Sequence, residues 1–172
     1  MIEVFVPKLI VQTIYDIPLS ELYAQGIRGI ITDLDNTLVS AKTELATKEL
    51  VEWLNKVRDM GIDVVIVSNN NHSRVGTFSS PLNIPYIFSA KKPTQKAFKK
   101  AIEMLGLSPS QILMIGDQMM TDVFGGNKIG LHTVLVNSIA PHEEGLGTKI
   151  NRRLEKIAIR RLRKRGLWQE EE

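Results

Sequence analysis

Short, mostly apolar runs alternate with helix-like segments along this chain, and this alternation constrains the fold more than any other feature. The runs occupy residues 27–32, 62–67, 84–88, 112–115 and 133–136. Such runs are typical of strands that are buried on both faces of a sheet. Strands separated by single helices and short connections predict a doubly wound α/β fold, with a parallel sheet and right-handed crossovers.

The segments between the runs carry the helix signals. A helix is expected to begin at Thr43 or Thr47 and to stop at Gly61, because apolar residues recur there at helical spacing. Further helices are expected over residues 94–105 and, more briefly, 123–129. The Gly/Ser/Pro-rich stretch between residues 69 and 83 predicts a loop. The apolar segment 2–17 allows two interpretations, packing inside the domain or docking elsewhere.

Composition limits the classes of protein to consider. The 172 residues are 43% hydrophobic and 24% charged, as expected for one globular domain. The absence of cysteine excludes disulfides, thiolate metal sites and cysteine nucleophiles. No apolar run approaches the roughly 20 residues of a membrane span, and no signal-peptide pattern begins the chain. We therefore expect a cytoplasmic protein, with peripheral membrane association left open.

Two acids directly follow the run 27–32. Asp33 and Asp35 are two residues apart, so an extended chain points them to the same side. Ligands of open α/β sheets bind at the carboxyl ends of the strands, and two buried carboxylates require a cation or a proton there. One Asp can act as a covalent nucleophile, and the second can serve as general acid and base. By itself the pair is more typical of a polar turn after a strand than of a catalytic site.

Three further polar clusters follow later strands. In isolation, Ser68 with Asn69 reads as a helix cap and Lys92 as a solvated lysine. Asp117 and Asp122 read as a polar loop that caps a helix, although carboxylate oxygens also suit Mg²⁺. Because each cluster comes after its own strand, the four together predict one active site at the edge of the sheet.

These clusters, in this order, resemble the motifs of the haloacid dehalogenase-like phosphatase superfamily, whose core is Rossmann-like. The first motif matches Asp33-Leu-Asp35-Asn-Thr37, the second Ser68, the third Lys92 and the fourth Gly116-Asp117 through Asp122. The match covers roughly residues 27–137.

The resemblance implies a role for each residue. Asp33 would be the nucleophile that forms an aspartyl-phosphate, and Asp35 the general acid/base. The implied cofactor is Mg²⁺, held by Asp33, by Asp35 through its carbonyl, by Asp117 and by Asp122 directly or in the outer shell. The implied phosphate-binding residues are Asn36, Ser68, Asn69 and Lys92.

Spacing between the motifs indicates how open the site is. Asp35 and Ser68 are separated by 32 residues, and Ser68 and Lys92 by 23. Neither interval can hold a separate cap domain of the kind that many relatives insert. The site is therefore expected to admit phosphate groups on large or surface-bound molecules, unless oligomerisation covers it.

The C-terminal segment has a different charge from the rest. Residues 1–148 carry 13 Lys and Arg against 15 Asp and Glu, whereas residues 149–172 carry 9 against 4. We therefore divide the chain into a phosphatase domain, 1–148, and a basic amphipathic helix or tail, 149–172. Its apolar positions predict one helix face, Ile150, Leu154, Ile157, Ala158 and Leu162. Such a helix can bind an anionic membrane, bind RNA or dock on its own domain.

Most of the chain, roughly residues 5–145, is similar to the YqeG-type phosphatases of subclass IIIA, which resemble mitochondrial phosphatidylglycerophosphate phosphatases. The similarity rests on the sequences Asp-Asn-Thr-Leu, Ser-Asn-Asn, Lys-Lys-Pro and Gly-Asp-Gln-Met-Met-Thr-Asp. It implies hydrolysis of phosphatidylglycerophosphate or another membrane phosphomonoester. The alternatives are a soluble sugar-phosphate or nucleotide phosphatase, and a phosphate- or RNA-binding module that keeps the fold.

Overall fold

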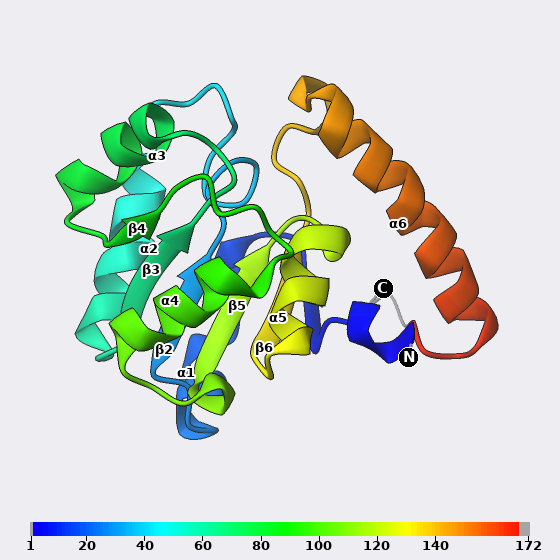
Figure 1. The fold of residues 1–172 in the computed structure, drawn as a ribbon. Coiled ribbons are helices and arrows are strands. Elements are labelled where there is room, and N and C mark those ends of the chain that lie inside the picture. Colours follow the sequence, from blue (N-terminus) through cyan, green and yellow to red (C-terminus); the bar gives the residue numbers. More distant parts are fainter. Residues whose placement is uncertain (1, 169–172) are drawn as a thin grey trace.

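The computed structural model describes residues 2–168, and these residues are built around one six-stranded, all-parallel sheet (Figure 1). The strand order is β1-β6-β5-β2-β3-β4. The strands are β1 Leu9–Val11, β2 Gly29–Thr32, β3 Asp63–Val67, β4 Tyr86–Ile87, β5 Ile112–Gly116 and β6 His132–Val136. The helices are α1 Leu19–Ala24, α2 Lys48–Asp59, α3 His72–Ser79, α4 Gln95–Leu105, α5 Phe124–Lys128 and α6 Leu146–Lys164. The predicted doubly wound parallel α/β fold is confirmed, and no separate cap domain is inserted within residues 2–168.

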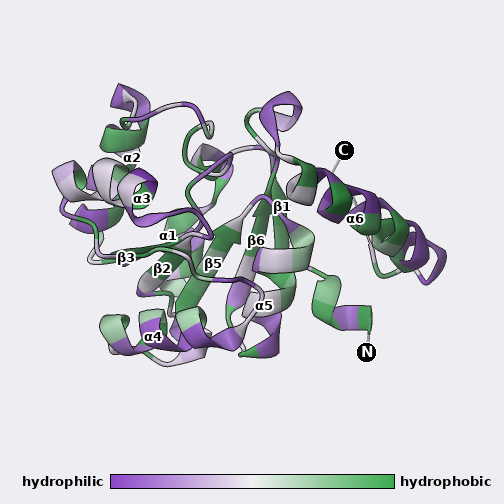
Figure 2. Cartoon of the chain, turned by 45° about the horizontal axis from the view of Figure 1, so that its top comes forward, coloured by the Kyte–Doolittle hydropathy of each residue, from purple (hydrophilic) through white to green (hydrophobic). Residues whose placement is uncertain are grey.

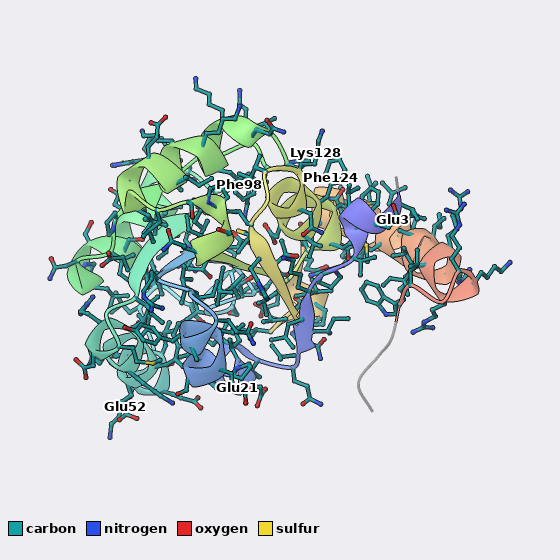
Figure 3. The ribbon with its side chains drawn as sticks, turned by 90° about the horizontal axis from the view of Figure 1, so that it is seen from below. Glu3, Glu21, Glu52, Phe98, Phe124 and Lys128 are labelled. Atoms are coloured by element: carbon teal, nitrogen blue, oxygen red, sulfur yellow. The ribbon has the colours of Figure 1, made fainter. Side chains whose placement is uncertain are left out.

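Helices cover both faces of the sheet, and the strand alternation explains how. Successive side chains of a strand point to opposite faces, so Ile30 packs with α1, α2 and α3 while its neighbour Ile31 packs with α4. Viewed from below in Figure 3, Phe98 and Phe124 mark the α4 and α5 side, and Glu21 and Glu52 mark the α1 and α2 side. Each face of the sheet thus has its own hydrophobic core. Ile30 is fully buried in one core and Ile31 in the other.

The register of the central strands aligns their carboxyl ends. Ile31 of β2 lies beside Val65 of β3 on one side and beside Met114 of β5 on the other. The residues that follow β2, β3 and β5 therefore emerge at the same edge of the sheet. This is the edge where ligands of open α/β sheets bind.

The structure decides between the two interpretations of the N-terminal segment and corrects one predicted element. The apolar N-terminal segment contributes β1, which pairs with β6 through Leu9 and Val134. The stretch predicted to be a loop contains α3, so that prediction was wrong. Asn71 caps this helix by accepting from the backbone N–H of Arg74, and Val75 and Phe78 are buried. A cap and two apolar residues one turn apart outweigh the local Gly and Ser content.

The long helix α6 lies beyond the β1 edge of the sheet, with its first turns near the carboxyl ends of the strands (Figure 1). In the hydropathy view of Figure 2 it carries both hydrophobic and hydrophilic residues along its length. Leu162 is fully buried against Met119, Val123 and Trp168. Among the described residues, no helix is both long and apolar enough to cross a membrane. The final Glu run of the predicted tail lies outside the described residues.

Candidate active site

The first predicted motif forms a turn at the end of β2. The backbone N–H of Asp33 still pairs with β5, donating to the carbonyl of Ile115 at 2.9 Å. Asn36 then takes a left-handed conformation, with φ of 63°, which Asn tolerates better than most residues. Asp33 is almost completely buried, whereas the side chain of Asp35 is 19% exposed. The turn therefore places one carboxylate inside the site and the other at its opening.

Asp35 is held by two residues that follow β3. The Nε of Arg74 donates to its Oδ1 at 3.0 Å, and the Nδ2 of Asn70 donates to its Oδ2 at 2.8 Å. Arg74 also donates to the backbone carbonyls of Thr43 and Ser40, in the segment that follows the first motif. Arg74 thus fixes both the carboxylate of Asp35 and the segment beside it.

Lys92 links the first and fourth motifs. Its Nζ lies 2.9 Å from Oδ1 of Asp33 and 2.8 Å from Oδ1 of Asp122, and its side chain is 2% exposed. Burial lowers the pKa of Lys92, but the charges of Asp122 and Asp33 outweigh that effect and the net pKa is raised. Asn69 braces the same loop, because its Oδ1 accepts from the backbone N–H of Lys92 at 2.7 Å. The two carboxylates therefore favour the charged form of Lys92 inside the site.

The fourth motif follows β5. Asp117 Oδ1 accepts from the hydroxyl of Thr37 at 3.1 Å, which joins the first and fourth motifs. Asp122 lies in a π-helical turn, Met119–Val123, and its Oδ2 accepts from the backbone N–H of Gln118. A Cβ on residue 116 would lie 2.2 Å from Oδ2 of Asp122. Gly116 is therefore required for Asp122 to fold back against the end of the strand.

The carboxylates of Asp33, Asp117 and Asp122 fit a divalent cation. One oxygen from each lies within 4.8 Å of the others, and all three residues are buried. Burial, followed by the charges of Asp33 and Asp122, raises the pKa of Asp117 to about 7. Burial and Asp33 likewise raise the pKa of Asp122 to about 6, although Lys92 opposes the shift. Crowded carboxylate oxygens of this kind are the donors that Mg²⁺ prefers.

An open cavity of about 580 Å³ lies in front of these groups. The predicted residues that line it are Asp33, Asp35, Asn36, Ser68, Asn69 and Lys92. Asp117 and Asp122 lie behind it, where Asp122 contacts Lys92 and Asp117 contacts Thr37. The structure thus brings all eight predicted residues to one edge of the sheet. The hydroxyl of Ser68 accepts from the backbone N–H of Asn70, and Asn36 Oδ1 is buried without a hydrogen-bond partner.

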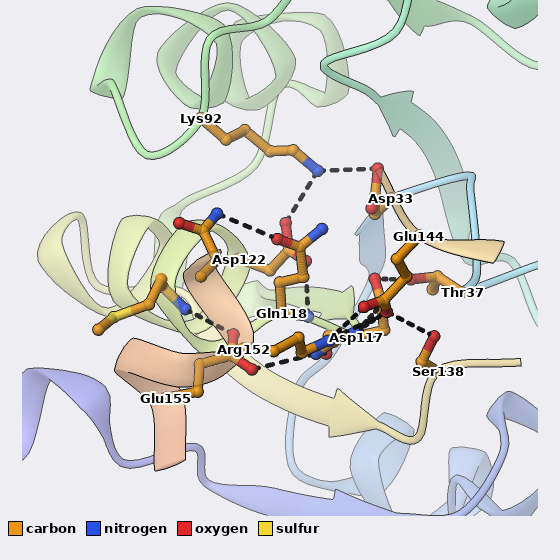
Figure 4. A network of polar contacts seen from close by, with 12 residues as sticks. Asp33, Thr37, Lys92, Asp117, Gln118, Asp122, Ser138, Glu144, Arg152 and Glu155 are labelled. Carbon is orange, nitrogen blue, oxygen red and sulfur yellow. Dashed lines mark hydrogen bonds and ion pairs between the residues drawn. The ribbon is translucent and has the colours of Figure 1, made fainter. Parts of the chain in front are cut away.

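The C-terminal helix contributes residues that the sequence did not point to. Gly147, Thr148 and Asn151 line the same cavity, and Asn151 donates to Gln118 at 3.3 Å. Arg152 reaches Asp117, Glu144 and Glu155, as Figure 4 shows. The sequence of the helix contains many basic residues, and nothing in it distinguishes Arg152 as the one that pairs with Asp117. Arg74 was missed for a related reason, because its segment was predicted to be a loop.

Comparison with known proteins agrees with this geometry. A family model described as haloacid dehalogenase-like hydrolase matches residues 30–91, and a HAD-hydrolase-like model matches residues 89–151. The chain is 44% identical to the probable phosphatase YqeG of Bacillus subtilis, over 98% of this chain and 97% of that protein. It is 26% identical to phosphatidylglycerophosphate phosphatase 1, chloroplastic/mitochondrial, of Arabidopsis thaliana, over 94% of this chain. The aligned part is 49% of the Arabidopsis protein, so the chain spans about half of that relative's length.

Solved structures share the fold. The deoxy-D-mannose-octulosonate 8-phosphate phosphatase of Haemophilus influenzae, solved in a cobalt-bound form, aligns with a TM-score of 0.52 at 15% identity, over 79% of this chain and 89% of that chain. A haloacid dehalogenase-like hydrolase of Brucella suis aligns with a TM-score of 0.53 at 13% identity, over 74% of this chain and 92% of that chain. The fold, the ordered motifs and the YqeG relationship together define a phosphatase. The chain belongs to the haloacid dehalogenase-like hydrolase family.

Proposed function

We propose that this phosphatase is a Mg²⁺-dependent phosphomonoester hydrolase that works through an aspartyl-phosphate on Asp33, with phosphatidylglycerophosphate or a similar membrane phosphomonoester as substrate. The observation that carries the chemistry is the position of Asp33. Its carboxylate lies at the cavity, beside the charged amine of Lys92 and within reach of the Asp117 and Asp122 carboxylates. A nucleophile, a phosphate-binding cation and the donor set of a hard metal ion are thus adjacent.

The proposed reaction has two steps. An oxygen of Asp33 attacks phosphorus, and the bond between phosphorus and the alcohol oxygen breaks as Asp35 gives its proton to the leaving alcohol. Asp35 then takes a proton from water, whose oxygen attacks phosphorus and releases Asp33 and inorganic phosphate. Lys92 offsets phosphoryl charge throughout, and Asn36, Ser68 and Asn69 border the phosphoryl position in the cavity. Bound Mg²⁺, held by the carboxylates of Asp33, Asp117 and Asp122 and the carbonyl of Asp35, would supply further charge stabilisation.

Two observations support a membrane substrate. The relatives of Arabidopsis thaliana and Chlamydomonas reinhardtii named phosphatidylglycerophosphate phosphatase 1 align with 94% and 90% of this chain. In addition, α6 exposes an apolar stripe: Leu146, Ile150, Leu154 and Ile157 are 82%, 58%, 46% and 47% exposed. An exposed apolar row on one helix face commonly marks an interaction site.

Basic residues border this stripe. Lys149, Arg153, Lys156 and Arg160 are exposed on the same helix. An apolar row flanked by cations matches the interface of an anionic bilayer, with acyl chains below and charged headgroups above. Because Gly147 and Thr148 of α6 also line the catalytic cavity, a helix lying on a membrane would hold that cavity near the lipid headgroups. We therefore propose peripheral contact with an anionic membrane.

The deciding experiment measures phosphate release from phosphatidylglycerophosphate in mixed micelles with Mg²⁺, for the wild type and Asp33→Asn. Sugar phosphates and nucleotides are tested in parallel. Turnover of the lipid that vanishes in the variant supports both the chemistry and the substrate class. Turnover of soluble esters alone would reject the lipid substrate and favour a soluble sugar-phosphate or nucleotide phosphatase. Absence of any turnover, combined with salt-sensitive RNA binding, would favour a binding module.

A further inference from the structure

The C-terminal helix α6 is attached to the rest of the molecule at its two ends. At one end Leu162 packs with Trp168, Met119 and Val123. At the other end Arg152 and Glu155 contact the fourth motif. A cavity of about 640 Å³ is lined by Ile159 of α6 and by Val136 of β6, and Ala158 and Ile159 also pack against the cluster around Leu162. The polar contacts around Arg152 therefore attach the first half of α6 to the fourth motif.

Arg152 makes a dense set of contacts with the segment that carries the fourth motif. Its Nη2 donates to Oδ2 of Asp117 at 2.5 Å, and its Nη1 donates to the backbone carbonyl of the same residue. A planar guanidinium can hold two acceptors of one residue in a fixed geometry, which a lysine cannot. Thr37 donates to the other carboxylate oxygen of Asp117 at 3.1 Å. The Asp117 side chain is thus held from both of its oxygens.

Two buried acids hold the guanidinium in place. Glu144 Oε1 accepts from Nη2 at 2.7 Å and from Nε at 3.0 Å, and Glu155 Oε2 accepts from Nη1 at 3.1 Å. The side chains of Glu144 and Glu155 are 3% and 8% exposed. The carboxylates of Asp117, Glu144 and Glu155 thus share one guanidinium. Ser138 completes the bracing by donating to Glu144.

Two further contacts extend from α6 to the loop between the two predicted metal ligands. Glu155 Oε1 accepts from the backbone N–H of Met120 at 3.3 Å, and Asn151 donates to Gln118 at 3.3 Å. Asp117, Gln118 and Met120 therefore all contact the same helix. None of these contacts involves a residue of the exposed apolar stripe. The side of α6 that carries Asn151, Arg152 and Glu155 therefore contacts the fourth motif.

Building on the proposed function, we propose that Arg152 is a positioning residue for Asp117, so that the C-terminal helix completes the metal-binding part of the active site. Arg152 fixes the Asp117 carboxylate close to those of Asp33 and Asp122, within the 4.8 Å cluster. Without the guanidinium, Asp117 would lose its cationic partner and its contact with the helix, whereas Asp33 and Asp122 would still pair with Lys92. The helix then serves two purposes, with its exposed apolar stripe at the membrane and Arg152 at the metal ligand.

The test compares Mg²⁺ binding by purified full-length wild type, Arg152→Met and Arg153→Met. Arg153 is the matched control, since it is the next residue of the same helix but is exposed. Mg²⁺ affinity is measured by calorimetry and by the Mg²⁺-dependent rise in Tm, with no substrate or lipid present. Residues that orient a metal ligand typically change affinity by roughly 10- to 100-fold. We expect weakening of that size for Arg152→Met and wild-type affinity for Arg153→Met.

Other outcomes would overturn the proposal. Unchanged Mg²⁺ affinity in a folded Arg152→Met protein with a lowered Tm would make Arg152 only an anchor for the helix. Tighter binding would make it a competing counter-ion. If Arg152→Met does not fold, Glu144→Gln tests the same cluster, and we expect a smaller loss of affinity in the same direction. A wild type that binds Mg²⁺ but hydrolyses no phosphomonoester would reject the proposed function while the affinity comparison still decides the role of Arg152.

Discussion

Arg74 of α3 and Asp35 of the first motif form an ion pair, with Nη2 of the arginine 2.9 Å from Oδ1 of the carboxylate. Both side chains are mostly buried, at 13% and 19% exposure. The same guanidinium donates to the carbonyls of Ser40 and Thr43. The proposed general acid/base therefore depends on a residue 39 positions later for its orientation.

Replacing Arg74 with Met should lower kcat for a generic phosphomonoester by roughly 10- to 100-fold, because misplacing a catalytic group has effects of that order. Arg58→Met is the control, since Arg58 is exposed and donates to Leu82 far from the cavity. Steady-state kinetics with both variants checks the effect. Equal kcat for Arg74→Met and wild type would show that Asp35 needs no such support.

Asp35→Asn should separate the two steps of the reaction. A good leaving group such as p-nitrophenolate needs no proton, so the first step should survive. The second step loses its general base, which we expect to slow turnover by ~10²–10⁴-fold. Stopped-flow measurement with p-nitrophenyl phosphate should then show a burst of one equivalent followed by slow release. A linear time course at the wild-type rate would remove Asp35 from the mechanism.

Gly116→Ala should disturb the site through Asp122. The added Cβ would lie 2.2 Å from Oδ2 of Asp122, so that side chain must move. Overpacking of a buried position typically costs about 1–3 kcal/mol in the free energy of unfolding. We expect that loss in denaturant unfolding, together with a weaker Tm response to Mg²⁺. Gly147→Ala is the matched control, because a Cβ there meets no atom within 4 Å.

The raised pKa of Asp117 predicts how stability depends on pH. Its folded pKa is about 7 against an ordinary value of 3.8, so the folded state binds more protons than the unfolded state between these values. In EDTA, this carboxyl therefore destabilises the fold progressively as pH rises from about 4 to about 7. Mg²⁺ binds the ionised form, so its stabilising effect should grow over the same range.

The measurement is the difference in Tm with and without Mg²⁺ at pH values from 5 to 8. Asp117→Asn is the comparison, because the amide does not titrate in this range. We expect the Mg²⁺-induced shift of the wild type to be largest above pH 7 and small at pH 5. A shift that does not vary with pH would argue against Asp117 as a metal ligand.

The exposed stripe of α6 predicts membrane binding that depends on apolar side chains. Replacing Ile150, Leu154 and Ile157 together with Ser should weaken binding to phosphatidylglycerol-containing vesicles by about 100-fold, if each side chain contributes on the order of 1 kcal/mol at the interface. Met104→Ser on α4 is the control, since Met104 is 45% exposed but lies on another helix. Vesicle sedimentation measures both variants. Equal binding by the triple variant and wild type would reject the membrane role of the stripe.

The local sequence determined the sheet and the residues at its edge. The runs before Asp33, Ser68 and Asp117 became β2, β3 and β5, because buried parallel strands are strongly apolar and end where the polar residues begin. The parallel topology then brought the predicted site residues together. The family resemblance supplied their proposed roles, and the relationship to YqeG agrees with the class of enzyme.

Other features were decided by tertiary contacts alone. β1 is a strand because β6 offers an unpaired edge, and three residues carry too little periodicity to reveal it. Helical periodicity placed Ile150 and Leu162 on one apolar face, yet Leu162 is buried and Ile150 is exposed. The difference arises because Leu162 packs against Met119, Val123 and Trp168, whereas Ile150 is exposed to solvent. Arg74 binds Asp35, and Arg152 binds Asp117, only after the chain has folded. The partners are 39 and 35 residues apart in the sequence, and no local pattern predicts contacts over such separations.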